Sequence, residues 1–253
     1  GYTADPLHEA DFNNTPGLIH KYHSRALLIV TKACAIHCRY CFRRHFPYED
    51  NQPSRAMWTK TLDYLQQHTE INEVIYSGGD PLASSNGQLS WLSQKVAAIK
   101  HIKTLRIHTR LPVVLPQRID TELLEILQQW PGKKVVVIHS NHVNELDASV
   151  KIAVDKLKAI GVTVLNQTVL LKGINDSATA LVQLSERLFD IGVLPYYLHL
   201  LDTVSGAAHF AISDNEAKAI MGEVTSRLPG YLVPRLVREE ADKTSKTPIL
   251  PTF

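Results

Sequence analysis

Three cysteines lie within eight residues of one another, and the 253-residue chain has no others. Cys34, Cys38 and Cys41 follow the spacing C-x3-C-x2-C. Thiols this clustered make a poor disulfide framework and indicate metal binding or catalysis. Three thiolates can bond three irons of a cubane cluster, which leaves the fourth iron open to a substrate. The spacing therefore predicts an oxygen-sensitive [4Fe–4S] cluster with one free coordination position.

Zinc is the alternative metal for these thiols, with His37 or His45 as a fourth ligand. Structural zinc sites usually combine two pairs of ligands, and the sequence has no second cysteine pair. A redox-sensing or zinc-binding interaction module would use the cysteines structurally. A brown protein with sulfur-to-iron absorbance would support the cluster, whereas a colourless zinc protein would support the module.

The remaining polar motifs follow segments that have the pattern of β-strands. Apolar, β-branched runs predict strands at 26–31, 73–77, 105–109, 134–139, 162–171 and 194–201. Apolar residues at three- and four-residue spacing predict helices at 58–68, 89–100, 121–129, 146–160, 178–191 and 215–227. This alternation predicts βα units around a parallel sheet, either an open partial barrel or a doubly wound sheet. Because ligands bind at the carboxyl ends of parallel strands, the residues that follow each strand are expected to share one site.

The bulk composition is that of a soluble globular protein, with 44% hydrophobic and 21% charged residues. A net charge of +2 predicts no nucleic-acid partner. No apolar run reaches the roughly 18 residues of a membrane span, and the start lacks a secretory signal, so we expect a cytoplasmic protein without membrane contact. The first residue is Gly1 rather than Met, which suggests a processed chain or a fragment. We expect a lead-in at 1–24, the barrel at 25–230 and a tail at 231–253 with a short strand at 232–237.

With Tyr40 before the third cysteine, the cysteine motif resembles that of the radical S-adenosylmethionine (SAM) superfamily. Other motifs are similar to those of lysine 2,3-aminomutases, and they cover almost the whole chain in order: RR at 43–44, SGGDPL at 77–82, RIHTRLPVVLP at 106–116, HSNHVNE at 139–145, NQTVLLKG at 166–173, PYYL at 195–198 and KTP at 246–248. CFRRHFPY at 41–48 and SGAAHF at 205–210 are most similar to the bacterial branch that makes β-lysine for elongation factor P.

The resemblance implies a partial (β/α)6 barrel and an isomerase that converts L-lysine to β-lysine, expected to be the R isomer. It implies three cofactors, namely a [4Fe–4S] cluster, SAM and pyridoxal 5′-phosphate (PLP). It also implies an electron donor such as flavodoxin or ferredoxin, a product that modifies elongation factor P, and an additional N-terminal segment. A mutase that makes β-lysine for another pathway is the nearest alternative.

The resemblance assigns Lys246 to the Schiff base with PLP, and Lys21, Tyr22 and Arg25 to its phosphate and ring. The glycine run that precedes this lysine in the mutases is replaced here by DKTS at 242–245, which makes Lys243 a rival. Such a loop has less conformational freedom than a glycine run.

The resemblance also assigns residues to the binding of the substrate and of SAM. Arg43 matches the arginine that binds the lysine carboxylate, which suits its planar guanidinium. Asp202 and Glu239 match the acids that pair with the ε-ammonium, although the mutases usually have aspartate where Glu239 stands. The residues expected near the methionyl group of SAM are Ser77, Gly78, Gly79 and Asp80. The expected pocket-lining residues without an assigned role are His139, His142, Asn166 and Gln167.

Overall fold

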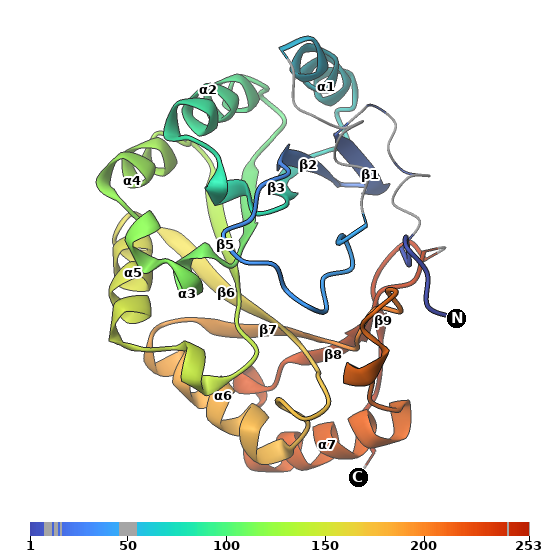
Figure 1. Cartoon of the computed structure of the whole chain (residues 1–253). Helices are drawn as coiled ribbons and strands as arrows, with labels where there is room; N and C mark the ends of the chain where they lie inside the picture. The colour runs from blue at the N-terminus through green and yellow to red at the C-terminus, as the bar shows by residue number, and fades with distance from the viewer. Residues whose placement is uncertain (8–11, 13–14, 16, 46–54, 242, 253) are drawn as a thin grey trace.

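A curved nine-stranded sheet forms the centre of the protein, and helices cover its outer face (Figure 1). The computed structural model describes residues 1–7, 12, 15, 17–45, 55–241 and 243–252. The strands are β1 (Leu18–Tyr22), β2 (Arg25–Thr31), β3 (Glu73–Gly78), β4 (Thr104–Thr109), β5 (Lys133–His139), β6 (Val162–Val169), β7 (Leu194–His199), β8 (Arg235–Arg238) and β9 (Thr247–Pro248).

The helices alternate with these strands along the chain. They are α1 (Arg55–Gln67), α2 (Asn86–Ala97), α3 (Leu111–Val114), α4 (Thr121–Gln128), α5 (Ala148–Ala159), α6 (Ala178–Asp190) and α7 (Asp214–Arg227). Short 3-10 turns occur at Pro81–Ala83, Pro116–Arg118, Val143–Glu145, Ala208–Phe210 and Gly230–Leu232. No helix in the described part of the chain is long and apolar enough to span a bilayer.

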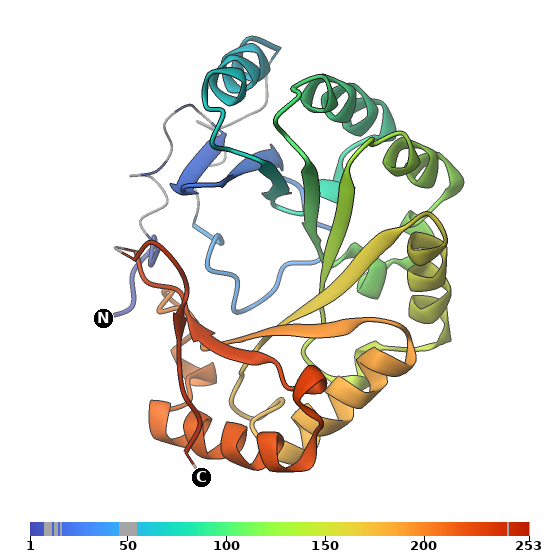
Figure 2. The same cartoon turned by 180° about the vertical axis from the view of Figure 1, so that it is seen from behind.

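The strand order identifies the fold as a partial barrel. The strands lie side by side in chain order, with β2 to β8 parallel and with β1 and β9 antiparallel at the two edges. In a doubly wound sheet the order of the strands would reverse at a switch point, and helices would cover both faces. Here the helices lie on one side, as both views show (Figures 1 and 2). Among the described residues no pairing joins β1 to β9, so the barrel is open.

The predicted strands correspond to β2 through β7, and the short strand predicted at 232–237 corresponds to β8. β1 was not predicted, because Leu18 and Ile19 are followed by polar residues and Gly17 precedes them. β1 lies in the expected lead-in and β8 and β9 in the expected tail, yet all three pair with the same sheet.

Side-chain alternation along each strand separates the core from the cavity. In β4, Leu105 and Ile107 are buried against the helices, whereas Arg106 and His108 line the inner cavity. The largest apolar cluster joins the outer faces of β2 to β6 to helices α1, α2, α4 and α5, and a second cluster lies beneath α6 and α7. A rigid outer layer therefore holds the polar inner face in place.

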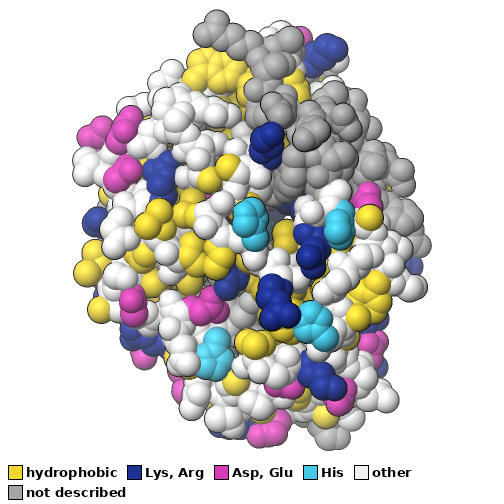
Figure 3. All heavy atoms as spheres, viewed as in Figure 1, with side chains coloured by type: hydrophobic (Ala, Val, Ile, Leu, Met, Phe, Trp, Pro, Cys, Tyr) yellow, Lys and Arg dark blue, Asp and Glu magenta, His cyan; other side chains and the backbone are white. Residues whose placement is uncertain are grey.

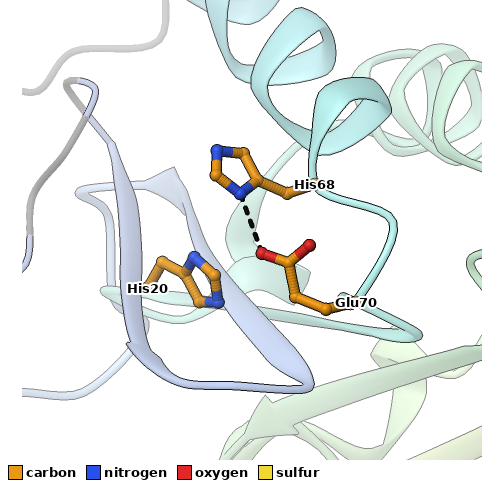
Figure 4. A group of neighbouring side chains, drawn as sticks. All are labelled: His20, His68 and Glu70. Carbon is orange, nitrogen blue, oxygen red and sulfur yellow. Dashed lines mark hydrogen bonds and ion pairs between the residues drawn. The ribbon is translucent and has the colours of Figure 1, made fainter.

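A polar cluster fastens β1 to the end of α1 (Figure 4). His68 Nδ1 shares a hydrogen bond with Glu70 Oε1 at 2.8 Å, and His20 Nδ1 shares one with the hydroxyl of Tyr64 at 2.8 Å. The rings of Tyr64 and His68 stack at 3.9 Å between centroids. Because Lys21 follows His20 on β1, this cluster also positions a residue of the predicted cofactor site.

Candidate active site

A cavity of about 700 Å³ lies inside the curved sheet. Every residue to which a role was assigned from the sequence lines it: Lys21, Tyr22, Arg25, Cys34, Cys38, Cys41, Arg43, Ser77, Gly78, Gly79, Asp80, Asp202, Glu239 and Lys246. These residues come from β1, from the ends of the parallel strands and from the β8–β9 edge. Figure 3 shows one face of the molecule, and Lys, Arg and His side chains gather around the middle of that face.

The three thiols lie in the loop after β2, which crosses the open middle of the ring in Figure 1. Backbone hydrogen bonds shape this loop, from Cys41 N to Cys38 O at 3.1 Å and from Arg44 N to Cys41 O at 3.2 Å. Burial, together with the Asp80 carboxylate and the other two thiols, raises the pKa of the Cys34 thiol to about 11. Three thiolates beside a carboxylate need a cationic partner, so this donor set fits an iron–sulfur cluster.

Gly78 and Gly79 fit against the backbone that leads to the cysteines. Gly78 has a φ of +120°, and a Cβ there would lie 2.5 Å from Thr31 O. A Cβ on Gly79 would lie 2.4 Å from Ala33 O. Hydrogen bonds run from Gly79 N to Thr31 O and from Asp80 N to Ala33 O, both at 2.8 Å. The glycines therefore position the cysteine loop as well as lining the cavity.

Asp80 joins the loops after β3 and β4. Its Oδ1 accepts hydrogen bonds from Thr109 Oγ1 at 2.6 Å and Leu82 N at 3.1 Å, and its Oδ2 accepts one from Arg110 N at 2.7 Å. Burial raises the pKa of this carboxyl, against the effect of these donors. Asp80 lines the cavity, but these contacts give it a role in holding the two loops together.

Arg43 is buried at the cavity wall, with 8% of its surface exposed. Its Nη1 donates to the hydroxyl of Ser77 at 2.8 Å, and its guanidinium lies 4.8 Å from the ring centre of Phe42. The hydrogen bond connects the cysteine loop to the end of β3. A planar, fixed guanidinium in a cavity of this kind suits a carboxylate ligand.

Glu239 is the centre of a charged group at the open edges of the barrel. It accepts hydrogen bonds from Lys246 Nζ, from the hydroxyl of Tyr22 and, at 3.3 Å, from Lys21 Nζ. Burial alone would raise the pKa of Glu239, but the Lys246 ammonium and these hydrogen bonds outweigh it and lower the pKa to about 2. Burial and Glu239 raise the pKa of Tyr22, which therefore stays a neutral donor.

The β8–β9 pairing explains how Lys246 reaches Glu239. Arg238 is paired with Thr247 across the two strands, which places Glu239 and Lys246 next to each other at the end of the hairpin. Lys246 is half-buried, lines the cavity and lies 5.7 Å from the ring centre of Tyr197. Lys243, the rival in sequence, is exposed and is not among the residues that line the cavity.

Arg25 and Asp202 complete the predicted set. The Arg25 guanidinium lies 4.4 Å from the ring centre of Tyr22, so both face the same part of the cavity. Asp202 follows β7 and lines the cavity, next to a segment that Thr3 fixes through a bond from Thr3 N to Thr203 O at 2.9 Å. The cations of Lys21 and Arg25 and the phenol of Tyr22 are of the kind that binds the phosphate and ring of PLP, and the nearby Lys246 is of the kind that binds its aldehyde.

Three imidazoles with buried Nε2 atoms form a further part of the cavity wall. His108, His139 and His199 each have an Nε2 atom without a hydrogen-bond partner among the described residues. Burial, together with nearby cations, lowers the pKa of His139 to about 4 and that of His199 to about 3. The same causes lower the pKa of His108. Neutral imidazoles with unpaired nitrogens are suited to hydrogen bonding with a ligand.

Of these three histidines, only His139 was expected at the pocket. The signal for the other two is their position, because His108 alternates with the buried Ile107 in β4, and His199 ends β7. Asn166, expected to line the pocket, is instead buried behind it, where its Oδ1 accepts from Ser140 N at 2.9 Å. Gln167 does line the cavity, whereas His142 is not among the lining residues and receives a hydrogen bond at Nδ1 from Asn144 N.

Comparisons with known proteins identify the family of the chain. The family model described as the radical SAM superfamily matches residues 28–184. L-lysine 2,3-aminomutase of Escherichia coli (strain K12) is 51% identical over 249 residues, which cover 98% of this chain and 72% of that protein. L-lysine 2,3-aminomutase of Clostridium subterminale is 36% identical over 251 residues, which cover 98% of this chain and 60% of that protein.

The solved structures share the fold at low sequence identity. The crystal structure of Streptococcus suis SuiB aligns with a TM-score of 0.59 and 15% identity, covering 86% of this chain and 49% of that chain. Native anSMEcpe with bound AdoMet and Kp18Cys peptide aligns with a TM-score of 0.57 and 12% identity, covering 81% and 59%. The structural likeness supports the partial barrel, and the sequence relatives are more specific. The chain belongs to the radical SAM superfamily and, within it, to the L-lysine 2,3-aminomutase family.

Proposed function

We propose that the chain converts L-lysine to (R)-β-lysine, which then modifies elongation factor P. The observation that carries the proposal is that three thiols, a lysine, a buried arginine and two carboxylates line one cavity of about 700 Å³. Relatives at 51% identity carry the name L-lysine 2,3-aminomutase. In this set the buried arginine is a counterpart for the carboxylate of lysine, and the two carboxylates are counterparts for its ε-ammonium.

The proposed cofactors are a [4Fe–4S] cluster on Cys34, Cys38 and Cys41, SAM beside the segment at 77–80, and PLP near Lys246. When bound, these groups supply a carbon-centred radical and a carrier for the migrating amino group. The protein's own part is to hold each group and to exclude competing hydrogen donors and water.

Each charged residue has a defined task in this proposal. Arg43 binds the substrate carboxylate, because its guanidinium is buried and fixed by Ser77. Lys246 would hold PLP through its amine, while Lys21, Tyr22 and Arg25 would hold its phosphate and ring. Asp202 and Glu239 pair with the ε-ammonium of lysine.

Glu239 must exchange partners for this to occur. In the structure it is bonded to Lys246, Lys21 and Tyr22, which are the groups proposed to hold PLP. Once these groups engage the cofactor, the ionised carboxylate is released to a new cation. The substrate ammonium can take the place that Lys246 leaves, so cofactor binding would prepare the substrate site.

The fate of the product is proposed from the motifs at 41–48 and 205–210. Residues 46–48 lie outside the described part of the chain, but the two motifs meet in the part that is described. A Cβ on Gly206 would lie 2.9 Å from Arg44 Nη1, and Nη2 of Arg39, two residues before the first motif, lies 3.1 Å from His209 Nε2. Arg44 of the first motif lines the cavity, and we propose that flavodoxin or ferredoxin delivers the electron on this side of it.

The test is anaerobic incubation of the reconstituted protein with dithionite, SAM, PLP and L-lysine. We expect mass spectrometry and chiral separation to show (R)-β-lysine. Formation of the S isomer would contradict the stereochemical part of the proposal and favour a mutase of another pathway. If no β-lysine forms while SAM is cleaved, the proposed substrate is wrong.

A further inference from the structure

Arg110, just beyond β4, contacts the loop that carries the cysteines. Its Nη1 donates to Cys38 Sγ at 3.6 Å and to the hydroxyl of Tyr40. Its Nη2 donates to Glu145 Oε2 at 2.5 Å. A single guanidinium therefore connects the cysteine loop after β2 with the loop after β5.

The surroundings of Arg110 hold it in one position. Its backbone N donates to Asp80 Oδ2 at 2.7 Å, and its side chain is 15% exposed. Glu145 is fixed in turn, because its Oε1 accepts from Asn141 N at 2.6 Å and from His142 N at 2.9 Å. The guanidinium is thus anchored independently of the thiol that it contacts.

Tyr40 closes this network from the side of the cysteine loop. Its hydroxyl also accepts a hydrogen bond from Asn141 Nδ2 at 2.7 Å. Burial raises the pKa of Tyr40 to about 12 despite the adjacent guanidinium, so the phenol remains neutral. The loop between Cys38 and Cys41 is therefore held by an arginine and an amide from the loops after β4 and β5.

A donor and a positive charge beside a ligand sulfur stabilise the more negative, reduced form of an iron–sulfur cluster. We propose that Arg110 is a positioning residue that holds the Cys38 thiolate and raises the reduction potential of the cluster through its N–H···S contact. This inference rests on the proposed function only in requiring a cluster on Cys34, Cys38 and Cys41. It does not depend on lysine or PLP.

The test is a redox titration of the anaerobically reconstituted protein, monitored by electron paramagnetic resonance, without SAM, PLP or lysine. In Arg110→Gln we expect the equilibrium constant for one-electron reduction to fall about tenfold, which is a shift of about 59 mV to more negative potential. Arg110→Lys keeps the charge but cannot reach Glu145 and Cys38 together, so we expect a smaller shift of the same sign.

Two control variants separate the contact from general damage to the fold. Arg118→Gln removes a guanidinium that binds Leu82 O at 2.7 Å and Asn86 Oδ1 at 2.7 Å, away from the cysteines. It should lower thermal stability without changing the potential. Tyr40→Phe removes the hydroxyl that accepts from Arg110 Nη1 and keeps the contact of Nη1 with Cys38 Sγ. The reduction potential should therefore not become more negative.

A variant of Arg110 with full iron content and the wild-type potential would overturn the inference. If neither Arg110 variant retains iron, Glu145→Gln is the deciding variant, because it keeps the Arg110 side chain but removes the carboxylate that fixes it. An unchanged reduction potential in Glu145→Gln would also refute the inference. A wild-type protein that holds no cluster at all would instead refute the proposed function.

Discussion

Lys246 and Lys243 lie three residues apart but in different environments. Lys246 is half-buried beside Glu239 and Tyr197, and Lys243 is exposed. We predict that Lys246→Ala abolishes the imine absorbance of PLP while the iron content per chain stays at the wild-type value. Lys243→Ala is the matched control and should keep the full imine band. A full band in Lys246→Ala would transfer the role to another lysine.

The Glu239 carboxyl makes the free energy of unfolding depend on pH in the acid range. Its folded pKa of about 2 lies below its ordinary value of 4.5, so its contribution is present above pH 4.5 and is lost as the pH falls towards 2. This difference corresponds to roughly 3 kcal/mol at most. We predict that the free energy of unfolding, measured in urea between pH 6 and pH 2, falls less steeply in Glu239→Gln. Glu223→Gln, which alters an exposed ion pair of α7, should follow the wild-type curve.

At the scale of elements, the turn after β3 and the loop after β2 depend on each other. We predict that Gly79→Ala lowers both iron content and melting temperature, because its Cβ would lie 2.4 Å from Ala33 O and 2.7 Å from Lys32 O. Gly87→Ala is the control, since no atom lies within 4 Å of its Cβ and it is in the first turn of α2. Alanine there should stabilise by about 0.5–1 kcal/mol. Normal iron loading of Gly79→Ala would show that the loop tolerates the displacement.

The parallel strands could be predicted from sequence because each has a buried, β-branched run and is followed by a helical pattern. The helix boundaries follow from capping residues such as Ser85, Asp147 and Ser213, each of which accepts a bond from a backbone N in the first turn. β1 and β9 could not be predicted, because β9 has only two residues and His20, Lys21 and Tyr22 carry no apolar alternation. These edge strands form through pairing with distant parts of the chain.

The same limit applies to the site. Spacing alone indicated the cysteine triplet, and a family resemblance supplied the candidate residues for PLP and lysine. Neither could show that Glu239 is bonded to Lys246, Tyr22 and Lys21, because these contacts require the two ends of the sheet to approach each other. The Arg110 network was missed for a similar reason, since it joins loops that are far apart in sequence.

At the scale of the whole molecule, the open seam of the barrel is bridged by side chains. β1 and β9 are not paired among the described strands, yet Lys21 and Tyr22 of β1 bind Glu239 beside the β8–β9 hairpin. Lys21 Nζ also donates to Glu240 O at 2.7 Å. The two edges should therefore open together when these contacts are removed.

We predict that the double variant Lys21→Met/Tyr22→Phe increases amide hydrogen exchange at both Leu18–Tyr22 and the β8–β9 hairpin. Exchange in β6 (Val162–Val169) should not change, because this strand is paired on both sides within the sheet. In the wild type, PLP should slow exchange at both edges, since its proposed ligands lie on both. If the double variant speeds exchange at only one edge, or PLP slows exchange at only one edge, then the edges move independently and Glu239 does not couple them. The side-chain contacts at Glu239 would then be a local feature of the β8–β9 hairpin rather than the closure of the barrel.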